Sequence, residues 1–181
     1  MIGKSLRKLL IQILLSALFS ALAFVISPIT WFQWGPTKAF PGQHMVNVLA
    51  GIMVGPLWAS LCAVIVGTLR IMFGVGTIFA YPGGIPGGLM VGILYMLLKN
   101  KFGSRKAIVL ASLGEPVGTV FIGGTISWYI VDPFFGSALY LKFGGILFLY
   151  LGWAVSSIIG CTIGMVLVLA LDKIGVLKFV E

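Results

Sequence analysis

Residues 41–73 read PGQHMVNVLAGIMVGPLWASLCAVIVGTLRIMF, and the path of this apolar stretch decides the fold. It is too long for one ordinary transmembrane helix and too short for two full helices of about 20 residues each. Gly55 and Pro56 break it in the middle, because proline interrupts helical hydrogen bonding. The stretch therefore predicts either one broken crossing or a hairpin of two short helices.

The positions of the basic residues distinguish these two paths. A single crossing would place the basic group at 99–106 opposite the basic N-terminus, whereas a hairpin places both on one side. Cytoplasmic connections are rich in lysine and arginine, so the positive-inside rule favours the hairpin. The cytoplasmic side then holds Lys4, Arg7, Lys8, Lys99, Lys101, Arg105, Lys106, Lys173 and Lys178. Lys38, Arg70 and Lys142 face the outside.

The whole chain has the composition of an integral membrane protein. Of its 181 residues, 60% are hydrophobic and 9% are charged, and the mean hydropathy is +1.15. Apolar runs predict six helices, at about 8–26, 43–54, 57–72, 84–98, 107–130 and 146–171. We predict an all-α integral membrane fold, a six-transmembrane-helix bundle in one domain over residues 1–181. Helices 2 and 3 either cross fully or form a re-entrant pair.

This topology also limits the partners and the location. We expect a multi-pass protein of the cytoplasmic membrane with both termini cytoplasmic, in contact with the lipid bilayer. The net charge of +8 lies mostly in short connections, so nucleic acid is not an expected partner. The run at 8–26 is long enough to span a membrane, and we expect a retained helix rather than a signal peptide. Cys62 and Cys161 lack metal-type spacing and are expected to fill helix packing, so no metal site is predicted.

Small residues recur every fourth position on three predicted helices. They are Ala17 and Ala21; Gly84, Gly88 and Gly92; and Gly152, Ser156, Gly160 and Gly164. Such ridges allow two membrane helices to approach closely. Most are expected to serve internal packing. For the ridge on the first helix, contact with a partner protein is the alternative.

Polar side chains within apolar helices are costly and indicate a function. Gln43, His44 and Asn47 share one face of the second predicted helix. Arg70 ends the third. At 100° per residue, Glu115, Thr119, Ile126 and Tyr129 form one stripe on the fifth, and Tyr150, Trp153 and Ser157 share a face of the sixth. The outer helix ends thus predict a small-molecule pocket with apolar and aromatic walls and a few polar groups.

Each of these polar residues also has a structural interpretation. His44 is compatible with a helix start at the interface, and Arg70 with a side chain that reaches lipid headgroups. Glu115 must pair, stay protonated or bind something; an ion pair with Arg70 or a hydrogen bond to a neighbouring helix are its structural options. The aromatic external connections at 28–42 and 131–145 are compatible with lids or with interface anchors.

Motifs for chemistry are missing from the sequence. It contains no GxxxxGK[ST], HExxH or GxSxG pattern, and the single histidine has no convincing nucleophilic partner. We therefore predict no catalytic residues and no enzyme activity. Two alternatives belong to other functional classes. One is a membrane enzyme that uses His44 and Glu115, and the other is a solitary ion-coupled carrier.

Three stretches carry a resemblance to a known family. They are AFPGQHMVNVLAGIMVGP at 39–56, TLRIMFGVGTIFAYPGG at 68–84 and GEPVGT at 114–119. With the basic N-terminus and the alanine ridge, they resemble the substrate-binding S components of energy-coupling factor vitamin transporters, and more specifically the ThiW family, assigned to the thiazole precursor of thiamin. The resemblance implies capture of substrate from outside, with a membrane scaffold subunit and two ATPase subunits as partners. ATP is then used by those partners, and this chain carries no cofactor.

The resemblance also implies where the sites lie. Ala17 and Ala21 correspond to the scaffold-docking face, and the substrate site to residues 28–47, 70–81 and the outer parts of the later helices. The implied ligand, 5-(2-hydroxyethyl)-4-methylthiazole, is small, neutral and aromatic; a phosphate ester would need more positive charge than Arg70 alone. Hydroxymethyl pyrimidine and thiamin itself are alternative substrates.

The individual ligands are inferred from the residues themselves. We expect His44, Asn47 and Glu115 to supply polar contacts and Trp153 or Tyr150 to stack on the ring. The remaining candidates for the site are Gln43, Arg70 and Thr119. Within the polar face of the second helix, we rank His44 and Asn47 ahead of Gln43.

Overall fold

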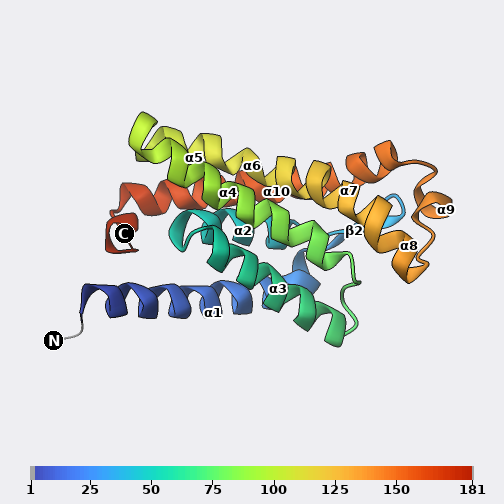
Figure 1. Cartoon of the computed structure of the whole chain (residues 1–181), viewed down its shortest axis with the longest axis horizontal. Helices are drawn as coiled ribbons and strands as arrows, with labels where there is room; N and C mark the ends of the chain where they lie inside the picture. The colour runs from blue at the N-terminus through green and yellow to red at the C-terminus, as the bar shows by residue number, and fades with distance from the viewer. Residues whose placement is uncertain (1–2, 181) are drawn as a thin grey trace.

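The computed structural model describes residues 3–180 and consists mainly of long helices. Within these residues, four helices are long and apolar enough to cross a membrane: α1 (Lys4–Thr30), α4 (Ala80–Phe102), the continuous helix Ser104–Phe135, and α10 (Ile146–Lys173). They lie along the long axis of the molecule, with the N- and C-termini toward the same end (Figure 1). The prediction of an all-α membrane protein is confirmed at this level.

The prediction of six helices is not confirmed. The described chain adds the short helices α9 (Leu139–Phe143) and α11 (Leu177–Val180). It also contains two antiparallel strands, β1 (Phe32–Trp34) and β2 (Thr37–Ala39), in which Phe32 pairs with Ala39 and Trp34 with Thr37. The pattern of apolar runs did not indicate this hairpin, because three-residue strands are too short to show an alternation.

The decisive stretch forms a hairpin of two short helices, α2 (Pro41–Met53) and α3 (Pro56–Met72). Gly55 makes the turn with φ of +92°, a conformation that favours glycine, and Pro56 starts α3 at a position that needs no N–H. The side chain of Gln12 on α1 donates a hydrogen bond to the carbonyl of Val54 at 3.0 Å, so the turn is tied to α1. At 1.5 Å per residue, both helices are shorter than the about 30 Å hydrocarbon core.

α2 occupies the centre of the molecule, and nearly all of its residues are buried. It packs against α1, α3, α4 and α10. Gly160 and Gly164 of α10 face α2 so closely that an added Cβ would collide with the carbonyls of Pro41 and Met45. These glycines therefore serve internal packing, as do Gly84, Gly88 and Gly92, which face α3 and the Gly55–Pro56 turn.

The helix 104–135 changes its pitch along its length. It comprises α5 (Ser104–Ser112), α6 (Gly114–Pro116), the π-helical η1 (Val117–Gly123), α7 (Gly124–Ile126), the π-helical η2 (Ser127–Val131) and α8 (Asp132–Phe135). Gly118 and Gly123, five residues apart, both face α4, where a Cβ would overlap the carbonyls of Pro86 and Pro82. The five-residue spacing matches the i→i+5 pattern of a π-helix.

The π-helical segments correct the predicted stripe on this helix. Glu115 and Thr119 point inward and are buried, but Tyr129 is exposed and Ile126 is only partly buried. A spacing of 100° per residue holds for an α-helix, whereas wider π-turns shift the later side chains around the axis. The stripe therefore extends only from Glu115 to Thr119.

Candidate functional site

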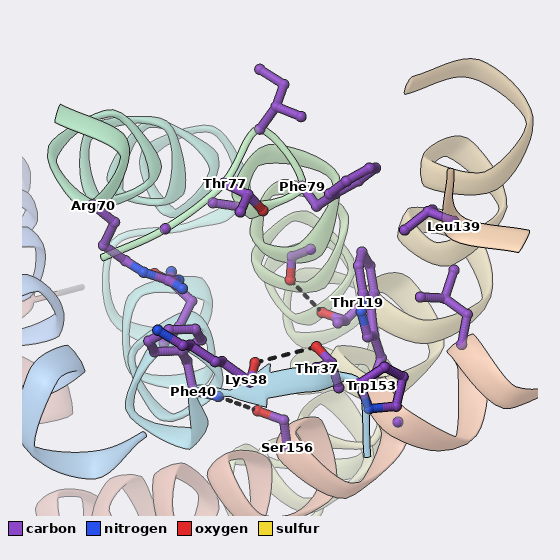
Figure 2. A pocket seen from close by; sticks show the side chains of 18 of the residues that line it. Thr37, Lys38, Phe40, Arg70, Thr77, Phe79, Thr119, Leu139, Trp153 and Ser156 are labelled. Atoms are coloured by element: carbon purple, nitrogen blue, oxygen red, sulfur yellow. Dashed lines mark hydrogen bonds between the residues drawn. The ribbon is translucent and has the colours of Figure 1, made fainter. Parts of the chain in front are cut away.

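A cavity of about 370 Å³ lies between the β-hairpin, the start of α2, the end of α3, the start of α4, and α9 and α10. It is therefore near the end of the molecule that carries β2 and α9, opposite the two termini (Figure 1). Figure 2 shows Arg70 and Phe40 on one side of it and Trp153 and Leu139 on the other. The volume falls in the range of small-molecule pockets, about 300–1,000 Å³.

The β-hairpin is held over the cavity by a contact with the last long helix. The backbone N–H of Phe40 donates a hydrogen bond to Oγ of Ser156 at 2.8 Å, which Figure 2 draws as a dashed line. Pro41 follows as the first residue of α2, where the missing N–H costs no helical hydrogen bond. This arrangement positions Thr37, Lys38 and Phe40 along the cavity wall.

A buried polar cluster lies behind the cavity, centred on Glu115. Its Oε1 accepts hydrogen bonds from Nδ1 of His44 at 2.8 Å, Nδ2 of Asn47 at 3.0 Å and the hydroxyl of Thr119 at 2.7 Å. Its Oε2 accepts one from the hydroxyl of Ser157. Glu115 is fully buried, and this set of donors is what a carboxylate needs away from water. Of its structural options, the observed one is hydrogen bonding to neighbouring helices, and Glu115 makes no ion pair with Arg70.

Gly87 of α4 makes room for this cluster. A Cβ at position 87 would overlap the side chains of Thr119 and Glu115 and would approach Nδ2 of Asn47 to 3.0 Å. Asn47 also donates to the carbonyl of Gly84 at 3.1 Å. The backbone of α4 thus closes the cluster on the side of that helix.

His44 and Gln43 connect the cluster to the cavity, because both line it. Nδ1 of His44 is bound to Glu115, and no other residue of the described chain hydrogen-bonds to its Nε2. Nε2 of Gln43 donates to Oδ1 of Asn47 at 3.2 Å, and its Oε1 likewise has no bonded partner in residues 3–180. Each side chain therefore has one polar atom in use and one available to a ligand.

Arg70 lies at the cavity with its orientation fixed by the following turn. Val75 and Gly76 both donate backbone hydrogen bonds to its carbonyl at 2.8 Å, and a Cβ at Gly76 would come within 2.9 Å of its Cβ. Its guanidinium carbon lies 3.6 Å from the centre of the Phe40 ring. Across the described residues, this guanidinium makes no ion pair and no hydrogen bond, and its Nε is buried.

The two aromatic candidates on α10 lie in different surroundings. Trp153 lines the cavity, and its indole N–H is without a hydrogen-bond acceptor among residues 3–180. Tyr150 points instead toward the helix 104–135, where its hydroxyl is 2.7 Å from that of Thr125 and its ring packs edge-on to Phe121. Of the two predicted stacking residues, Trp153 is the one at the cavity.

The structure thus separates the predicted site residues into two layers. Gln43, His44, Arg70, Thr119 and Trp153 line the cavity, whereas Asn47 and Glu115 lie behind it. The resemblance included Lys38 and Phe40 in the site only through the range 28–47, and Lys142 was not assigned to the site. The only available signal was their place in the external connections, and those connections contain more aromatic residues than the cavity uses: Trp31, Trp34, Phe134, Phe135 and Tyr140 are exposed.

The predicted docking residues lie on the outer face of α1. Ala17 and Ala21 are exposed, while Ser16, Phe19 and Ser20 are buried against the bundle. The ridge of small side chains on α1 is therefore left open on the surface, in contrast to the ridges of α4 and α10.

The comparison with protein families adds an independent observation. The family ThiW, described as thiamine-precursor transporter protein, matches residues 13–174. The chain belongs to the ThiW family. The match covers all four membrane-crossing helices in whole or in large part, together with every residue that lines the cavity. Comparisons with curated proteins and with solved structures gave no match.

Membership of the ThiW family bears on the class of function. A thiamine-precursor transporter handles a small molecule at a membrane, in agreement with the prediction of a transporter rather than an enzyme. In the described part of this ThiW chain, the cavity and the Glu115 cluster behind it bring several polar side chains together.

Proposed function

We propose that this chain is the substrate-binding S component of an energy-coupling factor importer and that it captures the thiazole precursor of thiamin in the cavity. The observation that carries the proposal is that four residues lining the cavity each keep a polar group without a partner in the described chain. These groups are Oε1 of Gln43, Nε2 of His44, Nε1 of Trp153 and the guanidinium of Arg70.

The chemistry of hydroxyethylthiazole fits these groups. Its ring nitrogen accepts a hydrogen bond, its hydroxyl donates and accepts, and its aromatic ring suits the faces of Trp153 and Phe40. Binding of such a ligand would satisfy polar groups of Gln43, His44 and Arg70, which are buried side chains and costly to leave unpaired. In this proposal Glu115 and Asn47 act as positioning residues, because they hold His44 and Gln43 in place without lining the cavity.

The orientation in the cytoplasmic membrane follows from charge. Both termini and the basic connection between α4 and α5 lie at the end of the molecule opposite β2 and α9 (Figure 1). The positive-inside rule assigns that basic end to the cytoplasm. The cavity then opens toward the outside, where a precursor is captured for uptake.

Binding to the purified protein tests the proposal. Calorimetric titration with hydroxyethylthiazole, hydroxymethyl pyrimidine and thiamin should show one-site binding of the thiazole and weaker binding of the other two. Asn47→Ala and Glu115→Gln should each weaken binding of the thiazole, because the hydrogen bonds that hold Gln43 and His44 in place are lost or weakened. A protein that binds pyrimidine or thiamin but no thiazole would instead be an S component for that compound.

The docking part of the proposal needs a separate experiment. Energy for uptake is assigned to a membrane scaffold subunit and two ATPase subunits, and the exposed Ala17 and Ala21 would form the scaffold contact. Replacement of both by Leu should abolish ATP-driven uptake in reconstituted vesicles while leaving substrate binding unchanged. Ile29→Ala, on an exposed position near the end of α1, is the control. Normal uptake by the double variant would remove Ala17 and Ala21 from the contact.

The buried His44–Glu115 pair favours one alternative, a solitary carrier driven by an ion gradient. Vesicles that contain only this chain distinguish the two mechanisms. Uptake that follows an imposed proton or sodium gradient would support the solitary carrier. Uptake that requires the ATPase subunits and ATP would support the S component.

A further inference from the structure

The cavity carries positive charge that no acidic side chain of the described residues balances. Arg70 is only 6% exposed, and its guanidinium has no ion pair or hydrogen bond within residues 3–180. Lys38 and Lys142 also line the cavity. Among the described residues, no aspartate or glutamate does. Three cationic residues, the buried Arg70 and the exposed Lys38 and Lys142, therefore line a space of about 370 Å³.

The acidic residues of the described chain are already engaged elsewhere. Glu115 is bound to His44 and to three other side chains. Asp132 accepts the backbone N–H of Leu139 with both oxygens, at 3.1 and 3.2 Å. Asp172 accepts the hydroxyl of Ser104 at 3.0 Å. None of these carboxylates lies within ion-pair distance of Arg70.

Arg70 does not have the geometry of an arginine that reaches toward lipid headgroups. Its side chain turns over the ring of Phe40 within the cavity wall, and the bend at 74–76 closes over its backbone (Figure 2). The contact with Phe40 stabilises the cation but does not neutralise it. A buried cation without a counter-charge is costly, and the cost is removed when an anion binds beside it.

We propose that the cavity selects an anionic thiamine precursor: a small aromatic heterocycle that carries a carboxylate or a phosphate monoester. The anionic group would lie at Arg70, whose planar fork matches two oxygens, and the ring would lie toward Trp153. A phosphate ester needs more positive charge than Arg70 alone, and Lys38 and Lys142 in the cavity lining add it. This inference rests on the proposed function of the cavity and specifies the form of the substrate.

The test is a calorimetric titration of the protein in nanodiscs of uncharged lipid. The three ligands are hydroxyethylthiazole, its phosphate monoester and the analogue in which a carboxylate replaces the hydroxymethyl group of the side chain. At least one anionic ligand should bind about tenfold or more tightly than the neutral alcohol. Arg70→Gln should weaken that ligand about 10- to 100-fold and should weaken the alcohol much less, because the alcohol has no charge for the guanidinium to pair with.

Matched variants separate a local charge effect from a general one. Arg70→Lys should retain part of the preference, because lysine keeps the charge but loses the bidentate fork. Arg105→Gln removes an exposed arginine of α5, outside the cavity lining, and should change nothing. If Arg70→Gln does not give a folded protein, the double variant Lys38→Gln/Lys142→Gln should lower the preference for the anion by the same logic.

The outcomes distinguish this inference from the proposed function. If the alcohol binds most tightly and the variants that lack Arg70 or the two lysines do not alter the order of ligand affinities, the inference is wrong and the proposed function stands. If no thiazole ligand binds, the proposed function is wrong as well. Native mass spectrometry tests whether a bound lipid, rather than a precursor, supplies the anionic group. A phospholipid retained by the wild type, lost in Arg70→Gln and not displaced by either anionic ligand would overturn the inference.

Discussion

Removal of the Glu115 carboxylate should destabilise the protein far more than removal of any other described carboxylate. In Glu115→Ala, His44, Asn47, Thr119 and Ser157 lose their shared acceptor. Each buried polar group that is left without a partner costs about 1–3 kcal/mol, and four groups are affected. Since 1 kcal/mol shifts the melting temperature by about 2–4 °C in a protein of this length, we expect a decrease of about 10 °C or more.

Glu115→Gln makes the prediction more specific. The amide oxygen can accept the hydrogen bonds that Oε1 receives, and the amide nitrogen can donate to the hydroxyl of Ser157. Hydrogen bonds to a neutral acceptor are weaker than those to a charged one, so the expected loss is about 1–3 kcal/mol, or about 5 °C. The glutamine variant should therefore lie between the wild type and the alanine variant.

Thermal unfolding of the detergent-solubilised protein, followed by intrinsic tryptophan fluorescence, gives these values. Asp172→Ala is the matched control, because Asp172 is only partly buried and accepts one hydrogen bond, from Ser104. A melting temperature of Glu115→Ala within about 2 °C of this control would refute the role assigned to the cluster. So would a glutamine variant that is as unstable as the alanine variant.

Three further predictions concern helix packing and ring contacts. Gly118→Ala and Gly123→Ala should each lower the melting temperature by several degrees in the same assay, because a Cβ at either position overlaps a carbonyl of α4, whereas Gly3→Ala, with open space around it, should not. Gln12→Leu should cost about 1 kcal/mol, the value of one hydrogen bond, and an unchanged melting temperature would show that the α2–α3 turn does not depend on it. Trp153→Phe should weaken thiazole binding less than Trp153→Ala does, since phenylalanine keeps a ring but lacks the indole N–H; equal losses in calorimetry would assign the contact to that N–H.

Much of the fold could be predicted because apolar runs and clusters of basic residues can be read directly from the sequence. The apolar runs located the long helices, and Gly55 with Pro56 located the turn of the hairpin at 54–56. The β-hairpin and the π-helical segments were missed for a common reason. Both depend on how a few residues pack against α10 and α4, and neither leaves a periodic signal in the sequence.

The candidate site shows the same limit. Polar residues in apolar helices identified Gln43, His44, Arg70 and Glu115, because such residues need partners. Which of them pair with one another could not be derived from spacing, since His44 and Glu115 are 71 positions apart. For Lys38 and Lys142, charge counting predicted only a place in the external connections. Whether they line the cavity depends on the fold of the β-hairpin and of α9.

The central position of α2 has a consequence for the order in which the protein assembles. During synthesis α2 emerges early, but the helix that covers it most extensively, α10, is the last long helix to emerge. His44 lacks its partner until Glu115 has been made, and the cluster around Glu115 is complete only after Ser157 has been made. The α2–α3 hairpin, which Gln12 ties to α1, therefore reaches its final packing only after α10 has been made. A chain truncated before α10 would leave that face open to lipid and to proteolytic quality control.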